Sequence, residues 1–265
     1  MKVLIVLQAR NASTRFKNKS LYPIGNISAI SHHLEKMVKL KEVCQNLIKI
    51  DLGLCTTGFS EDDILVHYAK KFHVKQIVRG KPLHLWEQFY DIVPGYKFFM
   101  RICGDQPFFN LKMAEHLLNV LYQNEEHDYY SWVTNNNIPI MQTKIGLGTE
   151  IVRSSKLNTR VQFNQNYMEH LTPKFYLEKG HKTKFIEIPE FITKSKVSLS
   201  IDYLEDWIIA NKCYYELKEK TQDLKVLSQW FMKNKIANSL LQGRNKAKEK
   251  YRGNKYKGEK WELTL

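Results

Sequence analysis

The chain has 265 residues, a hydrophobic fraction of 43% and a formal net charge of +14. This length suits one large domain with a sizeable core. The sequence has no apolar window of about 20 residues, the length of a membrane span, and the apolar run at residues 3–7 is too short for a signal peptide. Its four scattered cysteines lack the spacing of a zinc site or a disulfide framework. We therefore expect a reduced, cytoplasmic protein without membrane insertion.

The positive charge is densest in the C-terminal tail, where residues 244–260 are rich in Lys and Arg. A basic surplus is one mark of nucleic-acid binding, but a small anionic substrate explains part of it equally well. We expect residues 1–242 to form a single domain and residues 243–265 to form a basic, mobile extension.

Strands and helices alternate along the first half of the chain. Apolar runs predict strands at residues 3–7, 47–57, 74–78 and 97–103. Helical spacing predicts helices at residues 28–40, 60–72, 83–93 and 110–123. Ser60 with Asp63 is expected to cap the second helix, and Asn110 the fourth. This order predicts an α/β fold with a mostly parallel sheet flanked by helices on both faces.

The second half is less regular. Residues 128–150 are expected to hold a strand and an excursion, followed by a return strand at residues 149–153. The remaining pattern predicts strands at residues 184–188 and 197–201 and helices at residues 154–160, 165–179, 204–220 and 223–235.

Polar residues follow the first, second and fourth strands, at the sheet edge where parallel α/β folds bind ligands. The loop after the first strand carries Arg10, Arg15, Lys17 and Lys19 around the small residues 11–14. Backbone amides and cations are the groups that grip a polyphosphate. This loop is therefore predicted to bind a triphosphate, although Lys17 is better explained as a solvated surface charge.

The segment "LIVLQARNASTRFKNKSLYPIG" resembles the N-terminal signature of the cytidylyltransferases that activate acidic sugars. These are the CMP-ketodeoxyoctonate and CMP-sialic acid synthetases and, most similar, the SpsF-type spore-coat polysaccharide branch. Their signature is Q-A-R-x-x-S-T-R-L-P-G-K, and this chain has Phe16-Lys17-Asn18 where the family has Leu-Pro-Gly. "RICGDQP", "YMEHLTPKF" and "VSLSIDYLEDW" are similar to later family motifs, in the same order along the chain.

The resemblance implies a Rossmann-like, GT-A-like nucleotidyltransferase that uses Mg²⁺ to transfer CMP from CTP to a small anionic sugar, for surface polysaccharide or glycan assembly. It places the metal on Asp105 and Asp202, and catalysis on these two with Arg10 and Lys19. The implied nucleotide-binding residues are Gln8, Ala9, Arg10, Asn11, Ser13, Arg15, Lys19, Thr56, Arg79 and Gly104. Acceptor contacts are implied at Glu150, Glu169 and His170, and a homodimer through residues 128–148.

Other interpretations of these residues stay open. Asp105 also fits a plain turn and Asp202 a helix cap, while Asp62 and Asp63 fit a helix start. A glycosyltransferase of related architecture is one rival function, although "GDQP" stands where such enzymes carry D-x-D. The second rival function is that of a basic nucleic-acid-binding protein, which the aromatic residues of the tail favour. Nucleic acid is not the partner we expect.

The departures from the family pattern at residues 79–90 and 146–150 lie where the base or the acceptor would be recognised. The sequence therefore does not name the sugar.

Overall fold

The computed structural model describes residues 1–82, 84–157, 171–242 and 259–260. Within these ranges, eight strands form one sheet in the order β10-β9-β7-β8-β6-β1-β4-β5. Their bounds are β1 Lys2–Gln8, β4 Lys49–Thr57, β5 Gln76–Gly80, β6 Phe98–Cys103, β7 Tyr129–Val133, β8 Glu150–Arg153, β9 Thr183–Glu187 and β10 Glu259–Lys260. All neighbouring strands are parallel except β8, which is antiparallel to both β6 and β7. The predicted α/β fold with a mostly parallel sheet is confirmed.

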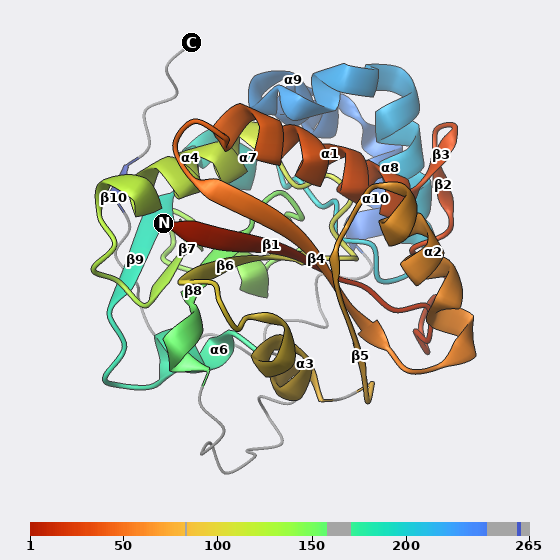
Figure 1. Cartoon of the computed structure of the whole chain (residues 1–265). Coiled ribbons are helices and arrows are strands. Elements are labelled where there is room, and N and C mark those ends of the chain that lie inside the picture. Colours follow the sequence, from red (N-terminus) through yellow and green to blue (C-terminus); the bar gives the residue numbers. More distant parts are fainter. Residues whose placement is uncertain (83, 158–170, 243–258, 261–265) are drawn as a thin grey trace.

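Helices cover both faces of the sheet. Their bounds are α1 Ala29–Cys44, α2 Asp63–Lys71, α3 Leu85–Ile92, α4 Leu111–Gln123, α6 Pro173–Leu177, α7 Glu190–Lys194, α8 Leu204–Leu217, α9 Leu224–Lys233 and α10 Lys235–Gln242. Figure 1 shows α1, α4 and α7–α9 above the sheet and α3 and α6 below it. None of the described helices combines the length and apolar character needed to cross a membrane.

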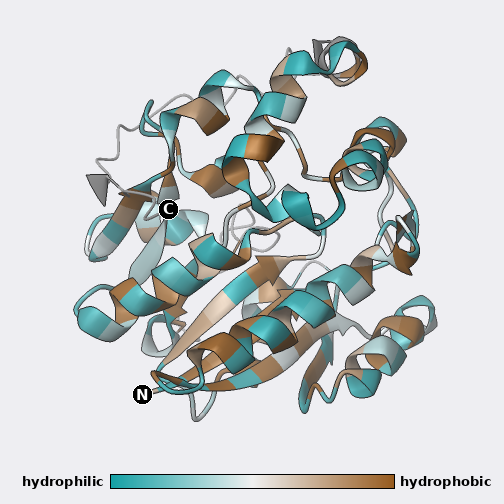
Figure 2. Cartoon of the chain, turned by 90° about the horizontal axis from the view of Figure 1, so that it is seen from above, coloured by the Kyte–Doolittle hydropathy of each residue, from teal (hydrophilic) through white to brown (hydrophobic). Residues whose placement is uncertain are grey.

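The central strand β1 explains how the two cores form. Its side chains alternate, so Val3, Ile5 and Leu7 enter the core under α1 and α4. Leu4 and Val6 enter the second core, which packs on α3 and α6. A parallel strand covered on both faces must be apolar throughout, which is why the sequence shows an unbroken run here. Figure 2 shows this apolar character on the central strands and alternating character on the helices.

Several predicted boundaries differ from the structure. Asn110 caps α4 as expected, since its side chain accepts the backbone N–H of Met113 at 3.0 Å. The expected Ser60 cap is wrong: residues 60–62 form a 3₁₀ turn, and α2 begins at Asp63 without a side-chain cap. The predicted helix over 204–220 is shorter in the structure: α8 ends at Leu217, and a 3₁₀ turn over Lys218–Gln222 follows it.

Residues 197–201 are not a strand of the sheet. The backbone N–H groups of Leu199 and Ser200 donate to the carbonyl of Lys144, and that of Ile201 donates to the carbonyl of Asp105. These donors are therefore used by two loops instead of a neighbouring strand, so the segment does not join the ladder. The other predicted strands are present, including the return strand β8.

Some expectations fall outside the described residues. In the predicted helix at 154–160, the described part holds a 3₁₀ turn at Ser154–Lys156. In the predicted helix at 165–179, the described part holds the short helix α6. In the C-terminal tail, only the two residues of β10 are described, and they pair with β9. The single domain over residues 1–242, the mobile tail and the dimerisation role of residues 128–148 remain predictions.

Candidate active site

The carboxyl ends of β1 and β6 approach each other closely, and Gly104 makes this approach possible. Its backbone N–H donates to the carbonyl of Gln8 at 2.8 Å. A Cβ at this position would lie 2.8 Å from that oxygen and 2.9 Å from the Cβ of Ala9. We expected Gly104 to border the nucleotide; its tight contact in the structure is with the end of β1. The loops that follow β1 and β6 therefore leave the sheet side by side.

The loop after β1 is fixed by Asp62, a residue that sequence reasoning had placed at a helix start. Asp62 is fully buried, and its Oδ1 accepts the backbone N–H of Asn11 at 2.7 Å. Its Oδ2 accepts the backbone N–H of Thr57 at 3.2 Å and the Thr57 hydroxyl. The side chain of Asn11 also donates to the carbonyl of Glu61 at 2.8 Å. Asp62 thus ties the loop to the end of β4.

Residues 16–18, which differ from the signature that the sequence resembles, form a turn in the structure. Asn18 has φ of +56°, the left-handed conformation that Gly adopts freely and Asn tolerates better than most residues. Its backbone N–H closes the loop on the carbonyl of Asn11 at 3.1 Å. Phe16 is buried, and its ring lies 4.5 Å from that of Tyr22. The altered sequence therefore still forms a tight turn between Arg15 and Lys19.

Arg10 and Arg79 face the β4–β5 side of the loop. Arg10 donates from Nη1 to the carbonyl of Pro82 at 3.1 Å. Arg79 donates to the carbonyls of Thr57 and Phe59, at 3.0 and 2.7 Å, and pairs with Asp63 at 2.6 Å. Both guanidinium groups thus hold neighbouring loops in the structure, and their contacts with a nucleotide stay predictions.

Two of the predicted nucleotide-binding residues carry a buried polar atom without a partner in the part of the chain that the structure describes. Asn11 Oδ1 and Thr56 Oγ1 have no hydrogen-bond partner among the described residues. Such atoms are uncommon in folded proteins because an unsatisfied buried group costs free energy. The backbone N–H of Ala9 donates to the carbonyl of Cys55 at 3.1 Å. Ser13 Oγ accepts the backbone N–H of Phe16 at 3.4 Å.

Asp202 is the centre of a cluster of cations. Its Oδ1 lies 3.1 Å from Arg15 Nη2 and 3.6 Å from Lys19 Nζ, and its Oδ2 lies 2.6 Å from Lys144 Nζ. Burial alone would raise the pKa of Asp202, but the hydrogen bond and charge of Lys144 and the charges of Lys19 and Arg15 hold it well below its ordinary value. The carboxylate is therefore charged. Lys144 was not found from the sequence, because it belongs to no motif.

The backbone around Asp202 is fixed by Asp206. Its Oδ2 accepts the N–H of Asp202 at 2.9 Å and that of Tyr203 at 3.0 Å. The N-cap of α8 is Tyr203, so the helix-cap role considered for Asp202 falls to its neighbours. The Asp202 carboxylate instead faces the loop after β1.

Asp105 lies beside this cluster. Its backbone carbonyl accepts the N–H of Ile201 at 2.7 Å, which places the loop after β6 against the segment that carries Asp202. Carboxylate oxygens are the hard ligands that Mg²⁺ prefers. Among the described residues, no group of three or more His, Cys, Asp or Glu side chains could hold a metal ion. The backbone bond brings the segments of the two aspartates together, and an Mg²⁺ ion held by Asp105 and Asp202 would take its other ligands from nucleotide phosphates and water, as is common for this ion.

Two side chains of α1 contact the backbone around the Asp105 loop. Lys36 Nζ donates to the carbonyls of Pro107 and Phe109, at 2.9 and 3.3 Å. His33 Nε2 lies 3.1 Å from the carbonyl of Cys103. Burial lowers the pKa of Lys36 to about 7 and that of His33 to about 4. Neither role could be predicted from the sequence, because both depend on contacts between α1 and a distant loop.

Glu150 belongs to a buried network of side chains that extends to Gln8 at the end of β1. One of its carboxylate oxygens pairs with Arg101 Nη1, and the other accepts the Tyr129 hydroxyl at 2.6 Å. Arg101 Nε in turn donates to Gln8 Oε1 at 2.7 Å. Glu150 is fully buried and both its oxygens are engaged, so its acceptor contact stays a prediction. The other two expected acceptor residues, Glu169 and His170, lie outside the described residues.

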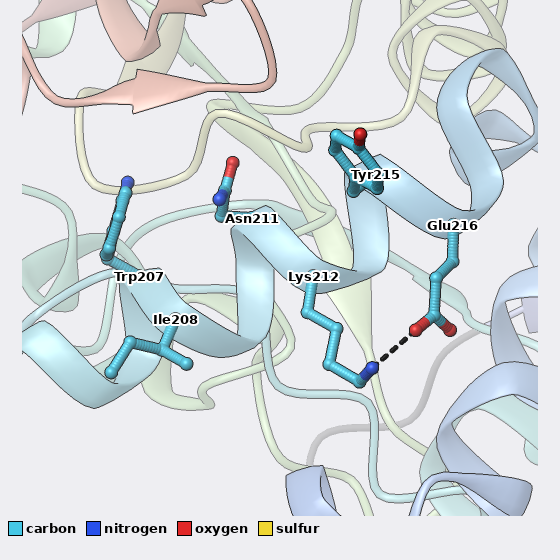
Figure 3. Close-up of a pocket in the computed structure, with 6 residues that line it drawn as sticks. All are labelled: Trp207, Ile208, Asn211, Lys212, Tyr215 and Glu216. Carbon is cyan, nitrogen blue, oxygen red and sulfur yellow. Dashed lines mark hydrogen bonds and ion pairs between the residues drawn. The ribbon is translucent and has the colours of Figure 1, made fainter.

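The helix α8 holds the hairpin that follows the cationic loop. Trp207 Nε1 donates to the carbonyl of Pro23 at 2.7 Å, and Asn211 Oδ1 accepts the N–H of Gly25 at 2.8 Å. Figure 3 shows these two side chains pointing toward the hairpin of β2 (Pro23–Ile24) and β3 (Ile27–Ser28). They line a pocket of about 300 Å³ on α8 that contains none of the predicted site residues; its other lining residues are Ile208, Lys212, Tyr215 and Glu216. The hairpin follows directly after the cationic loop.

The mostly parallel sheet flanked by helices is an α/β fold of the nucleotidyltransferase type. A model of the cytidylyltransferase family matches residues 4–236. The chain belongs to the cytidylyltransferase family, for which CTP is the expected nucleotide substrate. The family resemblance of the sequence is thereby confirmed.

Known proteins resemble the chain over most of its length. The spore coat polysaccharide biosynthesis protein SpsF of Bacillus subtilis is 24% identical over 230 residues, which are 82% of this chain and 88% of SpsF. A cytidylyltransferase structure from Leptospira borgpetersenii has a TM-score of 0.74 at 25% identity and covers 92% of this chain and 98% of its own. The CMP:2-keto-3-deoxy-manno-octonic acid synthetase solved with CTP shares the fold, with a TM-score of 0.60 at 12% identity, over 82% of this chain and 99% of its own.

Proposed function

We propose that the protein transfers CMP from CTP to a hydroxyl group of a small acidic sugar, with Mg²⁺ and with release of pyrophosphate. The observation that carries this proposal is the cluster at Asp202, where cations of the loop after β1 meet a charged aspartate next to the Asp105 loop. A nucleoside triphosphate with a divalent ion has the charges to match both halves of this cluster.

The chain's own residues have distinct tasks in this reaction. Arg15 and Lys19 would hold phosphate oxygens and compensate the charge that builds up on the departing pyrophosphate. Asp62 keeps the loop that carries them in its folded form. Asp105 and Asp202 are the residues that would hold Mg²⁺, whose chemistry there is to activate the acceptor hydroxyl and to neutralise phosphate charge. Positioning supplies the rest, because phosphoryl and nucleotidyl transfer need little covalent chemistry from the protein.

Support for an acidic acceptor comes from related proteins. The solved synthetase with the same fold is named for a keto-deoxy sugar acid. SpsF is named for spore coat polysaccharide, so assembly of a surface polysaccharide is the process we propose. Membership of the cytidylyltransferase family favours nucleotide transfer over the glycosyltransferase and nucleic-acid-binding alternatives. A homodimer through residues 128–148 is part of the same proposal.

The proposal is tested by following pyrophosphate release. The protein is incubated with Mg²⁺, each of the four nucleoside triphosphates, and a panel of sugar acids beside their neutral reduced forms. We expect release with CTP and a sugar acid only, and loss of release on addition of EDTA. Release with a neutral reduced form would overturn the acidic acceptor. Activity that survives EDTA would overturn the role of the metal.

A further inference from the structure

Lys144 lies in the segment between β7 and β8, yet it is attached to the Asp202 segment in two ways. Its backbone carbonyl accepts the N–H groups of Leu199 and Ser200, at 2.9 and 3.2 Å. Its ammonium lies 2.6 Å from Asp202 Oδ2 and 3.6 Å from Asp206 Oδ2. The side chain is 19% exposed. Lys144 is therefore held at the site by its backbone, whatever its ammonium binds.

The ammonium of Lys144 shares its partner with two residues of the phosphate loop. Arg15 and Lys19 contact Oδ1 of Asp202, and Lys144 contacts Oδ2. Lys144 and Arg15 also approach the ring of Tyr203, with 5.7 and 5.5 Å to its centroid. Among the described residues, three cations from two distant segments thus converge on one carboxylate. Cations surround a bound phosphate group in the same way. Here the carboxylate of Asp202 takes the position of the phosphate.

We propose that Lys144 is a phosphate-binding residue of the active site, which rests on Asp202 in the absence of ligand and transfers its ion pair to a phosphate oxygen of CTP. The inference rests on the proposed function, and it adds a residue from the β7–β8 segment to the nucleotide site. Lysine suits such an exchange because its ammonium is a point charge on a flexible four-carbon stem. The backbone bonds to Leu199 and Ser200 need not change. Asp202 is then available to a divalent ion.

The simplest other role for Lys144 is a fixed structural partner of Asp202. The two roles differ in what happens when the positive charge is removed. A phosphate-binding lysine contributes directly to CTP affinity, and its loss leaves Asp202 with one competitor fewer for a divalent ion. A structural partner contributes to the stability of the Asp202 segment and leaves CTP affinity unchanged while the fold is intact.

The experiment measures CTP binding by calorimetry in the presence of Mg²⁺, with four variants. Lys144→Met is expected to weaken CTP binding about tenfold or more, the loss of one charge-assisted contact. Lys144→Gln should behave similarly, which covers the case in which the Met variant is poorly folded. Lys144→Arg keeps the charge and should stay within about threefold of the parent. Lys112→Met removes an exposed lysine of α4 and serves as the control that should bind normally.

A second measurement uses Mn²⁺ alone, followed by electron paramagnetic resonance. Lys144→Met should bind Mn²⁺ at least as tightly as the parent, because the Asp202 carboxylate has lost a competing ammonium. Unchanged CTP affinity in the folded Met and Gln variants would overturn the inference and leave the proposed function standing. Weaker binding of both CTP and Mn²⁺ would also overturn it, since that result means a displaced Asp202. A parent protein that binds no CTP would overturn the proposed function itself.

Discussion

The backbone N–H of Ile201 donates to the backbone carbonyl of Asp105 at 2.7 Å, and Asp202 is the next residue along the chain. This single bond joins two motifs that lie far apart in the sequence. It brings the loop after β6 against the segment before α8, so that the two aspartates implied by the family resemblance reach the same edge of the sheet. The metal role of both residues can therefore be tested as one site.

Replacing either aspartate by asparagine should abolish most of the activity. Asp105→Asn and Asp202→Asn remove a charged ligand for Mg²⁺, and we expect each to lower kcat for pyrophosphate release by about 100-fold or more. Asp223→Asn is the matched control, because Asp223 caps α9 and asparagine is an equally good N-cap. Circular dichroism checks the fold of each variant. Near-normal turnover in a folded variant would remove that residue from the metal site.

Lys36 should make the stability of the protein depend on pH in the alkaline range. Burial lowers its pKa from 10.5 to about 7, against the opposing charges of Glu219 and Glu35. Between these two values the unfolded chain binds one proton more at this site than the folded protein, so the free energy of unfolding rises with pH. Below about pH 7 the contribution of Lys36 is constant, because both states are protonated.

This effect is measured by urea denaturation at several values between pH 7 and 10, for the parent and for Lys36→Met. The comparison cancels the other groups that titrate in this range. We expect the parent to gain stability with pH relative to the variant, by at most about 1.4 kcal/mol per pH unit. Parallel curves for the two proteins would show that Lys36 has an ordinary pKa, and curves of the opposite slope that its pKa is raised.

The strands and the cationic loop at the sheet edge could be predicted from the sequence, whereas the side-chain contacts that fix the loops there could not. The apolar runs that became β1, β4, β5 and β6 report burial directly, because a parallel strand is apolar on both faces. The loop between Arg10 and Lys19 was recognised from local charge density. Lys144, by contrast, acts through a contact with a residue distant in sequence, and nothing in its own surroundings reveals that contact.

The same limit explains two misassigned segments. Apolar and polar residues alternate over 197–201 as in a strand, but the carbonyls of Lys144 and Asp105 accept the N–H groups of residues 199–201. Ser60 and Asp63 have the spacing of a cap, yet the helix begins later and Asp62 accepts hydrogen bonds from Asn11 and Thr57. Local propensity is a weak prior where tertiary contacts compete for the same groups.

Asp62 is expected to be essential to the cationic loop. Asp62→Ala leaves the backbone N–H groups of Asn11 and Thr57 without their buried acceptor, and we expect a loss of about 3 kcal/mol in the free energy of unfolding. The loosened loop should also raise KM for CTP more than it lowers kcat, since Arg15 and Lys19 lose their positions. Its neighbour Asp63 is exposed and pairs with Arg79 at the surface, so Asp63→Ala should cost less than about 1 kcal/mol.

Denaturant unfolding and CTP-dependent kinetics test both effects together. Equal stability of the two alanine variants would mean that Asp62 does not hold the loop. A change in stability without a change in KM would mean that the loop keeps its form without Asp62.

Gly104 should tolerate no side chain. A Cβ there would lie 2.8 Å from the Gln8 carbonyl and 2.9 Å from the Ala9 Cβ, at the end of the central strand β1 and at the residue that follows it. Gly104→Ala is therefore expected to lower the free energy of unfolding by about 1–3 kcal/mol. Gly58→Ala is the control, since a Cβ at Gly58 has one neighbour within 4 Å, the Gly80 carbonyl at 3.9 Å.

Because β1 and β6 carry the loops of Arg15 and Asp105, forcing their ends apart should also disturb the site. We expect Gly104→Ala to lower kcat for pyrophosphate release, and Gly58→Ala to leave both stability and kcat close to the parent values. Thermal unfolding and the pyrophosphate assay measure the two quantities on the same samples. If Gly104→Ala were as stable and active as Gly58→Ala, the two strand ends would have room to separate, and the close approach of β1 and β6 would not be what positions the aspartate loop.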